Sequence, residues 1–344
     1  MTPALQTRDL TVGYHSRRRR RVVLSGLNLT VHPGEFVCLL GANGSGKTTL
    51  MRTLTRTQRA LAGSVEINGE NIARMSHYDL ARNVAVVLTE RIAVGAMEAY
   101  QLVELGRYPH SGWSGLLSER DNQIVRESIA AVGAQHLARR DVNELSDGER
   151  QRIMIARALA QRPAVLLLDE PSAFLDVSAR VEMIAMLRRL AREQNVSVVL
   201  SSHDLELALR TSDTIWLFDG TGGIKTGAPE DLLADGSVAA AFSGSGIVFD
   251  AEERAFKVRN TPHSKAFIEG DANRLGYATS ALEREGYAVT GSIEESDVQV
   301  TISAVGWDAK GQGRDGRGKT FAELAHFVRK RGDTPAPSFL EPHP

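Results

Sequence analysis

A glycine-rich stretch lies between an apolar segment and a helical pattern. It reads Gly41-Ala42-Asn43-Gly44-Ser45-Gly46-Lys47-Thr48 and is followed by Thr49. Glycines let the backbone approach a ligand closely, so successive N–H groups can surround phosphate oxygens, and a helix N-terminus attracts negative charge. The Lys47 ammonium would reach the β- and γ-phosphates, and the Thr48 hydroxyl would bind Mg²⁺. The stretch therefore predicts a nucleoside triphosphate site.

Two carboxylates follow a second apolar run, Val165-Leu166-Leu167-Leu168-Asp169-Glu170. Four consecutive apolar residues are typical of a strand that is buried on both faces of a parallel sheet. The carboxyl end of such a strand lies at the same edge of the sheet as the phosphate-binding loop. We expect Asp169 to belong to the Mg²⁺ shell and Glu170 to polarise an attacking water as general base.

The elements that must position these residues belong to a folded chain of 344 residues, 42% of them hydrophobic, which is enough for a sizeable core. A net charge of −1 argues against a globally basic nucleic-acid-binding protein. The single cysteine, Cys38, excludes a disulfide framework, and its apolar neighbours predict a buried, reduced thiol. No apolar run reaches the roughly 20 residues of a membrane span, and no secretory signal is visible, so we expect a cytosolic protein.

Short apolar runs alternate with helical patterns up to about residue 245. The expected strands cover residues 5–12, 27–31, 35–40, 65–67, 84–88, 165–168, 196–200 and 214–218. The expected helices cover residues 46–56, 98–105, 119–132, 149–160, 179–193 and 205–210. This order predicts an α/β fold with a mostly parallel core sheet covered by helices on both faces, an antiparallel N-terminal sheet, and a helical insertion over about 97–160.

Composition changes near Gly244-Ser245-Gly246, because lysine is scarce before this stretch and frequent after it. We expect one domain over 1–245, a small α+β extension over 246–334, and a proline-rich disordered tail over 335–344. In the extension the expected strands are 266–268, 288–290 and 298–302, and the expected helices are 271–285 and 320–330. Regulation, dimer stabilisation and a purely structural role stay open for this extension.

A third motif, Leu145-Ser146-Asp147-Gly148-Glu149-Arg150-Gln151, lies between the first two. By itself it predicts a helix N-terminus with Ser146 or Asp147 as N-cap. Together with the two motifs on either side, it makes the chain resemble the ATP-binding cassette (ABC) ATPases over about residues 5–235. The resemblance implies a P-loop NTPase of ABC type, with ATP and Mg²⁺ as its ligands and ATP hydrolysis as its activity.

The resemblance gives roles to further residues. Tyr14 resembles the aromatic residue that stacks on adenine, His203 the switch histidine that contacts the γ-phosphate, and Asp176 the aspartate loop that communicates across a dimer. In this family two copies pair head to tail, so Ser146, Gly148 and Glu149 would serve the partner's nucleotide. The implied catalytic residues are Glu170, His203 and Lys47. The residues implied to contact the nucleotide that is bound by the same copy are Tyr14, Gly41, Asn43, Gly44, Ser45, Gly46, Lys47, Thr48 and Thr49.

Two positions depart from the family pattern. The family usually has glutamine after the strand at 84–88, where this chain reads Leu88-Thr89-Glu90. Thr89 is too short to mimic the amide, so we expect Glu90 to reach the metal together with Thr48 and Asp169. Asp147 stands where glycine is common, and it either points away from the phosphates or is offset by Arg150.

The segment from Glu98 to His110, EAYQLVELGRYPH, resembles importer ATPases for iron-siderophores, haem and cobalamin. In those proteins this region meets a coupling helix of a separate membrane permease. Arg107, Tyr108 and Trp113 would then line the docking surface. The resemblance implies a peripheral subunit at the cytoplasmic face of the inner membrane. Its partners would be permease subunits, a second copy of itself and, indirectly, a substrate-binding protein, with no nucleic acid.

Three alternatives stay open. The segment at 98–110 is also compatible with an ordinary helical insertion whose aromatic residues pack inward. An exporter or lipoprotein-release ATPase shares the other motifs, and so does a soluble cassette protein that acts on DNA or ribosomes. The basic run from Arg17 to Arg21 indicates a solvated hairpin tip, with contacts to anionic lipid or to nucleic acid as the other interpretations.

Overall fold

The computed structural model describes residues 2–16, 19–88, 95–111, 115–242, 247–250, 255–258, 262–311 and 313–329. Contacts between residues divide the chain into two units, Met1–Lys257 and Val258–Pro344. None of the described helices is long and apolar enough to cross a membrane.

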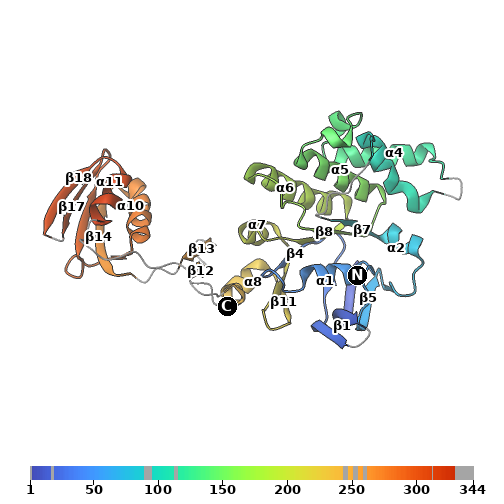
Figure 1. Ribbon diagram of the computed structural model, residues 1–344, viewed down its shortest axis with the longest axis horizontal. Coiled ribbons are helices and arrows are strands. Elements are labelled where there is room, and N and C mark those ends of the chain that lie inside the picture. The colour runs from blue at the N-terminus through green and yellow to red at the C-terminus, as the bar shows by residue number, and fades with distance from the viewer. Residues whose placement is uncertain are drawn as a thin grey trace. The chain divides into compact units, whose positions relative to one another are not determined.

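A six-stranded sheet forms the centre of the first unit (Figure 1). Its order is β11-β10-β4-β9-β8-β7, and all neighbouring strands are parallel except β11, which runs antiparallel to β10 at one edge. The mostly parallel core sheet predicted from the sequence is therefore confirmed. The strands are β4 (Phe36–Leu40), β7 (Val84–Val87), β8 (Val165–Asp169), β9 (Ser197–Ser201), β10 (Thr214–Phe218) and β11 (Ile224–Gly227).

The two faces of this sheet pack against different elements, because successive side chains of a strand point to opposite faces. On one face Phe36, Leu40 and Leu168 share a core with the larger set of helices. On the other face Val37 and Leu39 share a core with α1 (Lys47–Leu54), α2 (His77–Asn83) and the N-terminal strands. The helices of the first face are α3 (Ala99–Glu104), α4 (Glu119–Ala131), α5 (Asp147–Ala160), α6 (Val177–Gln194), α7 (Leu205–Thr211), α8 (Pro229–Ala234) and α9 (Ser237–Ala241).

The N-terminal strands form the predicted antiparallel sheet, in the order β2-β1-β5-β6 with β3 also on β1. The expected single strand at 27–31 is wrong, because β2 ends at Leu27 and the Asn28 side chain bonds to the backbone of Gly26 and Asp9 before β3 begins. Ser16 pairs with Arg19, so the described part of the arginine run lies at the end of the β1–β2 hairpin, as predicted. The bounds are β1 (Leu5–Ser16), β2 (Arg19–Leu27), β3 (Thr30–Val31), β5 (Ala62–Ile67) and β6 (Glu70–Asn71).

The second unit is a small α+β structure with a five-stranded sheet in the order β15-β14-β16-β17-β18. Alternate residues such as Val298, Val300 and Ile302 point into a core that α10 and α11 also form. The sequence did not predict β17 and β18, which are short and rich in charge and glycine. The elements are β14 (Ser264–Gly270), α10 (Ala272–Arg284), β15 (Tyr287–Thr290), β16 (Val298–Ile302), β17 (Trp307–Gly311), β18 (Arg314–Gly318) and α11 (Phe321–Arg329). A separate two-stranded sheet pairs β12 (Ile247–Asp250) with β13 (Ala255–Val258).

Candidate functional site

The glycine-rich loop connects the end of β4 to the beginning of α1. Gly44 and Gly46 have φ values of 77° and 108°, in the left-handed region that favours glycine, and Gly46 is the N-cap of α1. A Cβ at Gly41 would lie 2.7 Å from the Cβ of Phe218 on β10, so this position has no room for a side chain. The glycines therefore shape a turn whose backbone N–H groups precede and open a helix, which is the geometry that binds phosphate.

The Lys47 side chain is buried and folded over this loop. Its Nζ donates to the carbonyl oxygen of Gly41 at 2.7 Å and to that of Ala42 at 3.3 Å. Burial lowers the pKa of Lys47, and the carboxylates of Glu170 and Asp169 partly counteract this effect. The Ser45 hydroxyl is buried and has no hydrogen-bond partner among the described residues. A cation and a free donor at one turn fit an anionic phosphate group.

A serine from the neighbouring strand bonds to both Asp169 and Glu170. The Ser201 hydroxyl, at the end of β9, donates to Asp169 Oδ1 at 2.6 Å and accepts from the Glu170 N–H at 2.9 Å. One side chain thus sets the backbone at Glu170 and the orientation of the Asp169 carboxylate. Ser201 was not predicted from the sequence; its position at the end of an apolar strand, two residues before His203, was the available signal.

Glu170 and His203 lie in contact at this edge of the sheet. The imidazole Nε2 of His203 faces Glu170 Oε1, and both side chains are partly exposed. Glu170 has φ of 47°, which is unfavourable for a residue other than glycine, and such strain is found at functional sites. The structure therefore brings Lys47, Asp169, Glu170 and His203 together from β4–α1, β8 and β9.

Tyr14 lies beside the first turn of α1. Its hydroxyl is 2.9 Å from the hydroxyl of Thr49, and its ring is about half exposed. The ring borders a cavity of about 1030 Å³ whose wall also includes Thr48 and Asp169. An exposed aromatic face next to the phosphate-binding turn is suited to stacking on a base.

The third motif, residues 145–151, lies at the beginning of α5, on the opposite side of the sheet from α1 (Figure 1). Ser146 is the N-cap of α5, where its hydroxyl accepts from the Glu149 N–H and the Glu149 carboxylate accepts from the Ser146 N–H. Hydrogen bonds from the backbone and the side chain of Ser146 to the carboxylate lower the pKa of Glu149, and Arg140 adds to the effect. Because α5 and α1 belong to different cores, the structure does not bring Ser146, Gly148 and Glu149 to the copy's own loop.

Asp176 and the region around His203 are linked by an arginine that the sequence analysis missed. Asp176 caps α6 by accepting from the Ala179 N–H at 2.8 Å. Arg180, one turn further on, donates to Asp204 Oδ2 at 3.1 Å and to the Leu175 carbonyl at 3.3 Å. The segment before α6 and the segment after β9 are therefore tied to each other.

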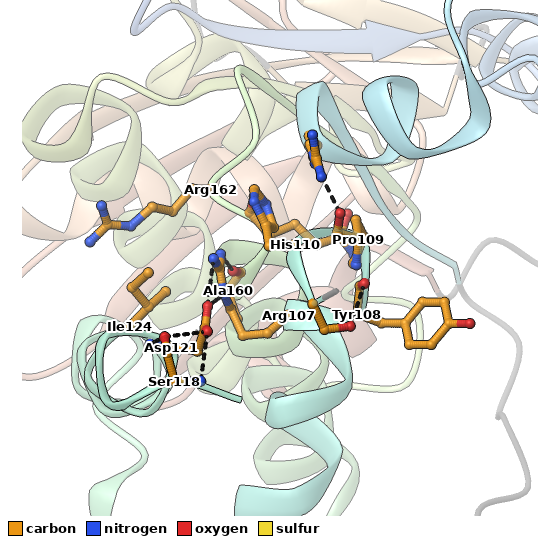
Figure 2. Close-up of polar contacts among 12 residues, drawn as sticks. Arg107, Tyr108, Pro109, His110, Ser118, Asp121, Ile124, Ala160 and Arg162 are labelled. Carbon is orange, nitrogen blue, oxygen red and sulfur yellow. Dashed lines mark hydrogen bonds and ion pairs between the residues drawn. The ribbon is translucent and has the colours of Figure 1, made fainter. Parts of the chain in front are cut away.

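Arg107 does not lie on the surface, so its predicted place on a docking surface is wrong (Figure 2). Only 5% of the residue is exposed, and its guanidinium is 2.9 Å from Asp121 Oδ1 and 2.6 Å from the carbonyl oxygen of Ala160. The arginine joins the 3₁₀ segment η1 (Leu105–His110) to α4 and to the end of α5. Tyr108, the next residue, is 65% exposed and points away from this cluster, as predicted.

Three predicted residues, Thr89, Glu90 and Trp113, and the predicted tail at 335–344 cannot be placed, because they lie outside the described residues. Asp147 lies in the first turn of α5, and Arg150 donates to the carbonyl oxygen of Val142 at 2.9 Å.

Cys38 is buried, as predicted, and burial raises the pKa of its thiol to about 12.

A phosphate-binding turn and a carboxylate pair at one edge of a parallel sheet define a P-loop nucleoside triphosphatase. The family described as ABC transporter matches residues 24–173. An uncharacterized ABC transporter ATP-binding protein of Methanocaldococcus jannaschii is 41% identical over 266 residues, which are 77% of this chain and 90% of that protein. The chain belongs to the ABC transporter family of ATP-binding proteins, and it is an ATPase.

Two further comparisons concern particular members. The iron(3+)-hydroxamate import ATP-binding protein FhuC of Bacillus subtilis is 37% identical over 209 residues, or 61% of this chain and 76% of that protein. A solved structure described as an inward-facing conformation of a metal-chelate type ABC transporter matches with a TM-score of 0.60 and 26% identity. That match covers 70% of this chain and 89% of the other.

Proposed function

We propose that this chain is the ATP-hydrolysing subunit of an importer that takes up an iron chelate, haem or cobalamin through a separate membrane permease. The juxtaposition of Lys47, Asp169, Glu170 and His203 carries the ATPase part of the proposal. The importer part is supported by the similarity to a protein named for iron(3+)-hydroxamate import and by the exposed Tyr108 on η1. The subunit works on the cytoplasmic face of the membrane, where ATP is available.

The residues at the sheet edge have separate tasks in hydrolysis. Lys47 leaves the carbonyl oxygens of the loop and donates to the β- and γ-phosphates, while Ser45 and the loop N–H groups donate to other phosphate oxygens. Tyr14 stacks on the base. Thr48 and Asp169 are oxygen ligands of the kind that Mg²⁺ prefers, and the ion would supply neutralisation of phosphate charge. Glu170 accepts a proton from the attacking water, and His203 holds that carboxylate and the γ-phosphate in position.

The site is completed by a second copy of the chain. Ser146 and Gly148 lie at the N-terminus of α5, with N–H groups suited to phosphate, yet they are remote from the loop of their own copy. A head-to-tail dimer places them over the partner's nucleotide. Asp176, at the beginning of α6, lies next to this contact and is tied through Arg180 to the segment that carries His203.

Replacing Glu170 with glutamine tests this proposal. The variant should bind ATP, hydrolyse it about 10² to 10⁴ times more slowly, and accumulate as an ATP-bound dimer in size-exclusion chromatography. Glu182→Gln on α6 is a matched control, since Glu182 is exposed and pairs with Arg152 away from the site. Normal hydrolysis by Glu170→Gln would contradict the catalytic role. Uptake of an iron chelate, haem or cobalamin by liposomes containing this chain, its permease and its binding protein would establish import, and ATP-driven efflux would contradict it.

A further inference from the structure

The last strand of the second unit, β18, has an open edge. Among the described residues it pairs only with β17, so the N–H and carbonyl groups of its outer side have no strand to bond. Proteins usually cover or blunt such an edge, because it can pair with another chain. The edge of β15, at the other side of the sheet, carries no charged residue that could select a partner. The edge of β18, in contrast, carries charged residues of both signs.

The sequence of β18, Arg314-Asp315-Gly316-Arg317-Gly318, is complementary to itself when it is read in the opposite direction. If two such strands pair antiparallel about Gly316, Asp315 of each copy lies opposite Arg317 of the other. Both side chains are exposed and lie on the same open face of the sheet. Opposite charges directly across an antiparallel pair stabilise it, and like charges destabilise it. A strand with charges of one sign would instead repel its own copy.

The other face of β18 also accommodates a second strand. Arg314 would lie opposite Gly318 of the second copy, so a long side chain meets a residue without one. A groove of about 530 Å³ lies at this edge and is lined in part by Trp307, Arg314, Gly316, Glu323, His326 and Phe327. The guanidinium of Arg314 lies over the Phe327 ring, 4.6 Å from its centre, and is held at the mouth of this groove.

We propose that β18 is a self-association surface, which pairs antiparallel with β18 of a second copy of this chain in the register centred on Gly316. Five residues a side give few hydrogen bonds, so the contact is weak when the chains are free. Where ATP joins two copies through the first unit, the same contact becomes intramolecular and gains an effective concentration in the millimolar range. The second unit then holds two copies near each other after ATP is hydrolysed.

Cysteine cross-linking of the full-length chain tests the register. A tagged Asp315→Cys chain mixed with an untagged Arg317→Cys chain should give a heterodimeric disulfide, because residues opposite each other lie within the 4.4–6.8 Å range of Cα distances for this bond. Asp315→Cys mixed with Lys310→Cys is the control. Lys310 is on β17, one strand further in, and should give no such product. The native thiol, Cys38, is buried with a raised pKa and does not interfere.

Charge reversal provides a second test, measured by sedimentation without nucleotide. Asp315→Arg or Arg317→Asp alone should weaken self-association at least about ten-fold, equivalent to 1.4 kcal/mol. The double reversal should restore it. Within one chain, Asp315 lies opposite Lys310 and Arg317 lies opposite Asp308. If these charges acted only within one chain, the double reversal would place like charges at both pairs. The double variant would then self-associate no better than either single variant.

Two results would overturn the proposal: no heterodimeric disulfide above the Lys310 control, or a double reversal no better than the single ones. Repeating the cross-link in a Lys47→Ala background separates this contact from the ATP-dependent dimer. The disulfide should still form there, and its formation does not depend on whether the proposed importer function is right.

Discussion

Replacing Arg107 with methionine should destabilise the first unit by about 3 kcal/mol. Removing one partner of a buried ion pair costs about 3 to 5 kcal/mol, because it leaves an uncompensated charge. The lower value applies here, since Asp121 keeps its hydrogen bonds from Ser118 and is 14% exposed. The carbonyl oxygen of Ala160, at the end of α5, also loses its donor. At about 2 to 4 °C per kcal/mol for a unit of this size, the melting temperature should fall by about 6 to 12 °C.

Because of this ion pair, the difference in stability between wild type and Arg107→Met should depend on pH. Hydrogen bonds from Ser118, with a further contribution from Arg107, lower the pKa of Asp121 to about 2. A carboxylate with a lowered pKa stabilises the fold above its unfolded pKa of about 4, and this stabilisation is lost as the pH falls toward 2. The stability difference between wild type and Arg107→Met should therefore be complete at pH 7 and narrow between about pH 4 and 2.

Chemical and thermal unfolding of the purified chain would measure both effects. Arg126→Met is the matched control, because Arg126 forms an exposed ion pair with Glu119 on α4 and its loss should leave the melting temperature nearly unchanged. An Arg107→Met chain that melts like wild type but no longer co-purifies with the permease would refute the reasoning. Arg107 would then act at the surface rather than in the interior.

Three further predictions concern the nucleotide and permease sites. Lys47→Ala should abolish most ATP binding in a fluorescence titration, since no other described cation bonds to the loop carbonyls at Gly41; unchanged affinity would contradict the loop assignment. Tyr108→Ala should change the free energy of unfolding by less than about 0.5 kcal/mol, yet lower the affinity for the permease roughly 30-fold in a pull-down. A lower melting temperature with an intact complex would instead place the Tyr108 ring in the core. Glu90→Ala should slow hydrolysis strongly and Thr89→Ala only mildly; small and equal effects would show that Glu90 does not reach the metal.

The parts of the site that depend on neighbours in the chain could be predicted from the sequence alone. A glycine-rich turn between an apolar strand and a helix has few alternative conformations, so Gly44, Gly46 and Lys47 could be placed before the structure was known. The same holds for Asp169 and Glu170, because a run of four apolar residues fixes where the strand ends. Strand-helix alternation was also enough to predict the parallel sheet.

Contacts between segments that are distant in the chain could not be predicted, because they form only when the whole chain folds. Arg107 was expected on the docking surface because its segment resembles that of importer ATPases, but its partners, Asp121 and Ala160, are 14 and 53 residues away. Ser201 gained its role only when β9 paired with β8 and brought its hydroxyl to the Asp169 carboxylate and the Glu170 N–H. β17 and β18 were missed because glycine and charge weaken a strand pattern locally, while pairing with β16 and packing against α11 outweigh this in the fold.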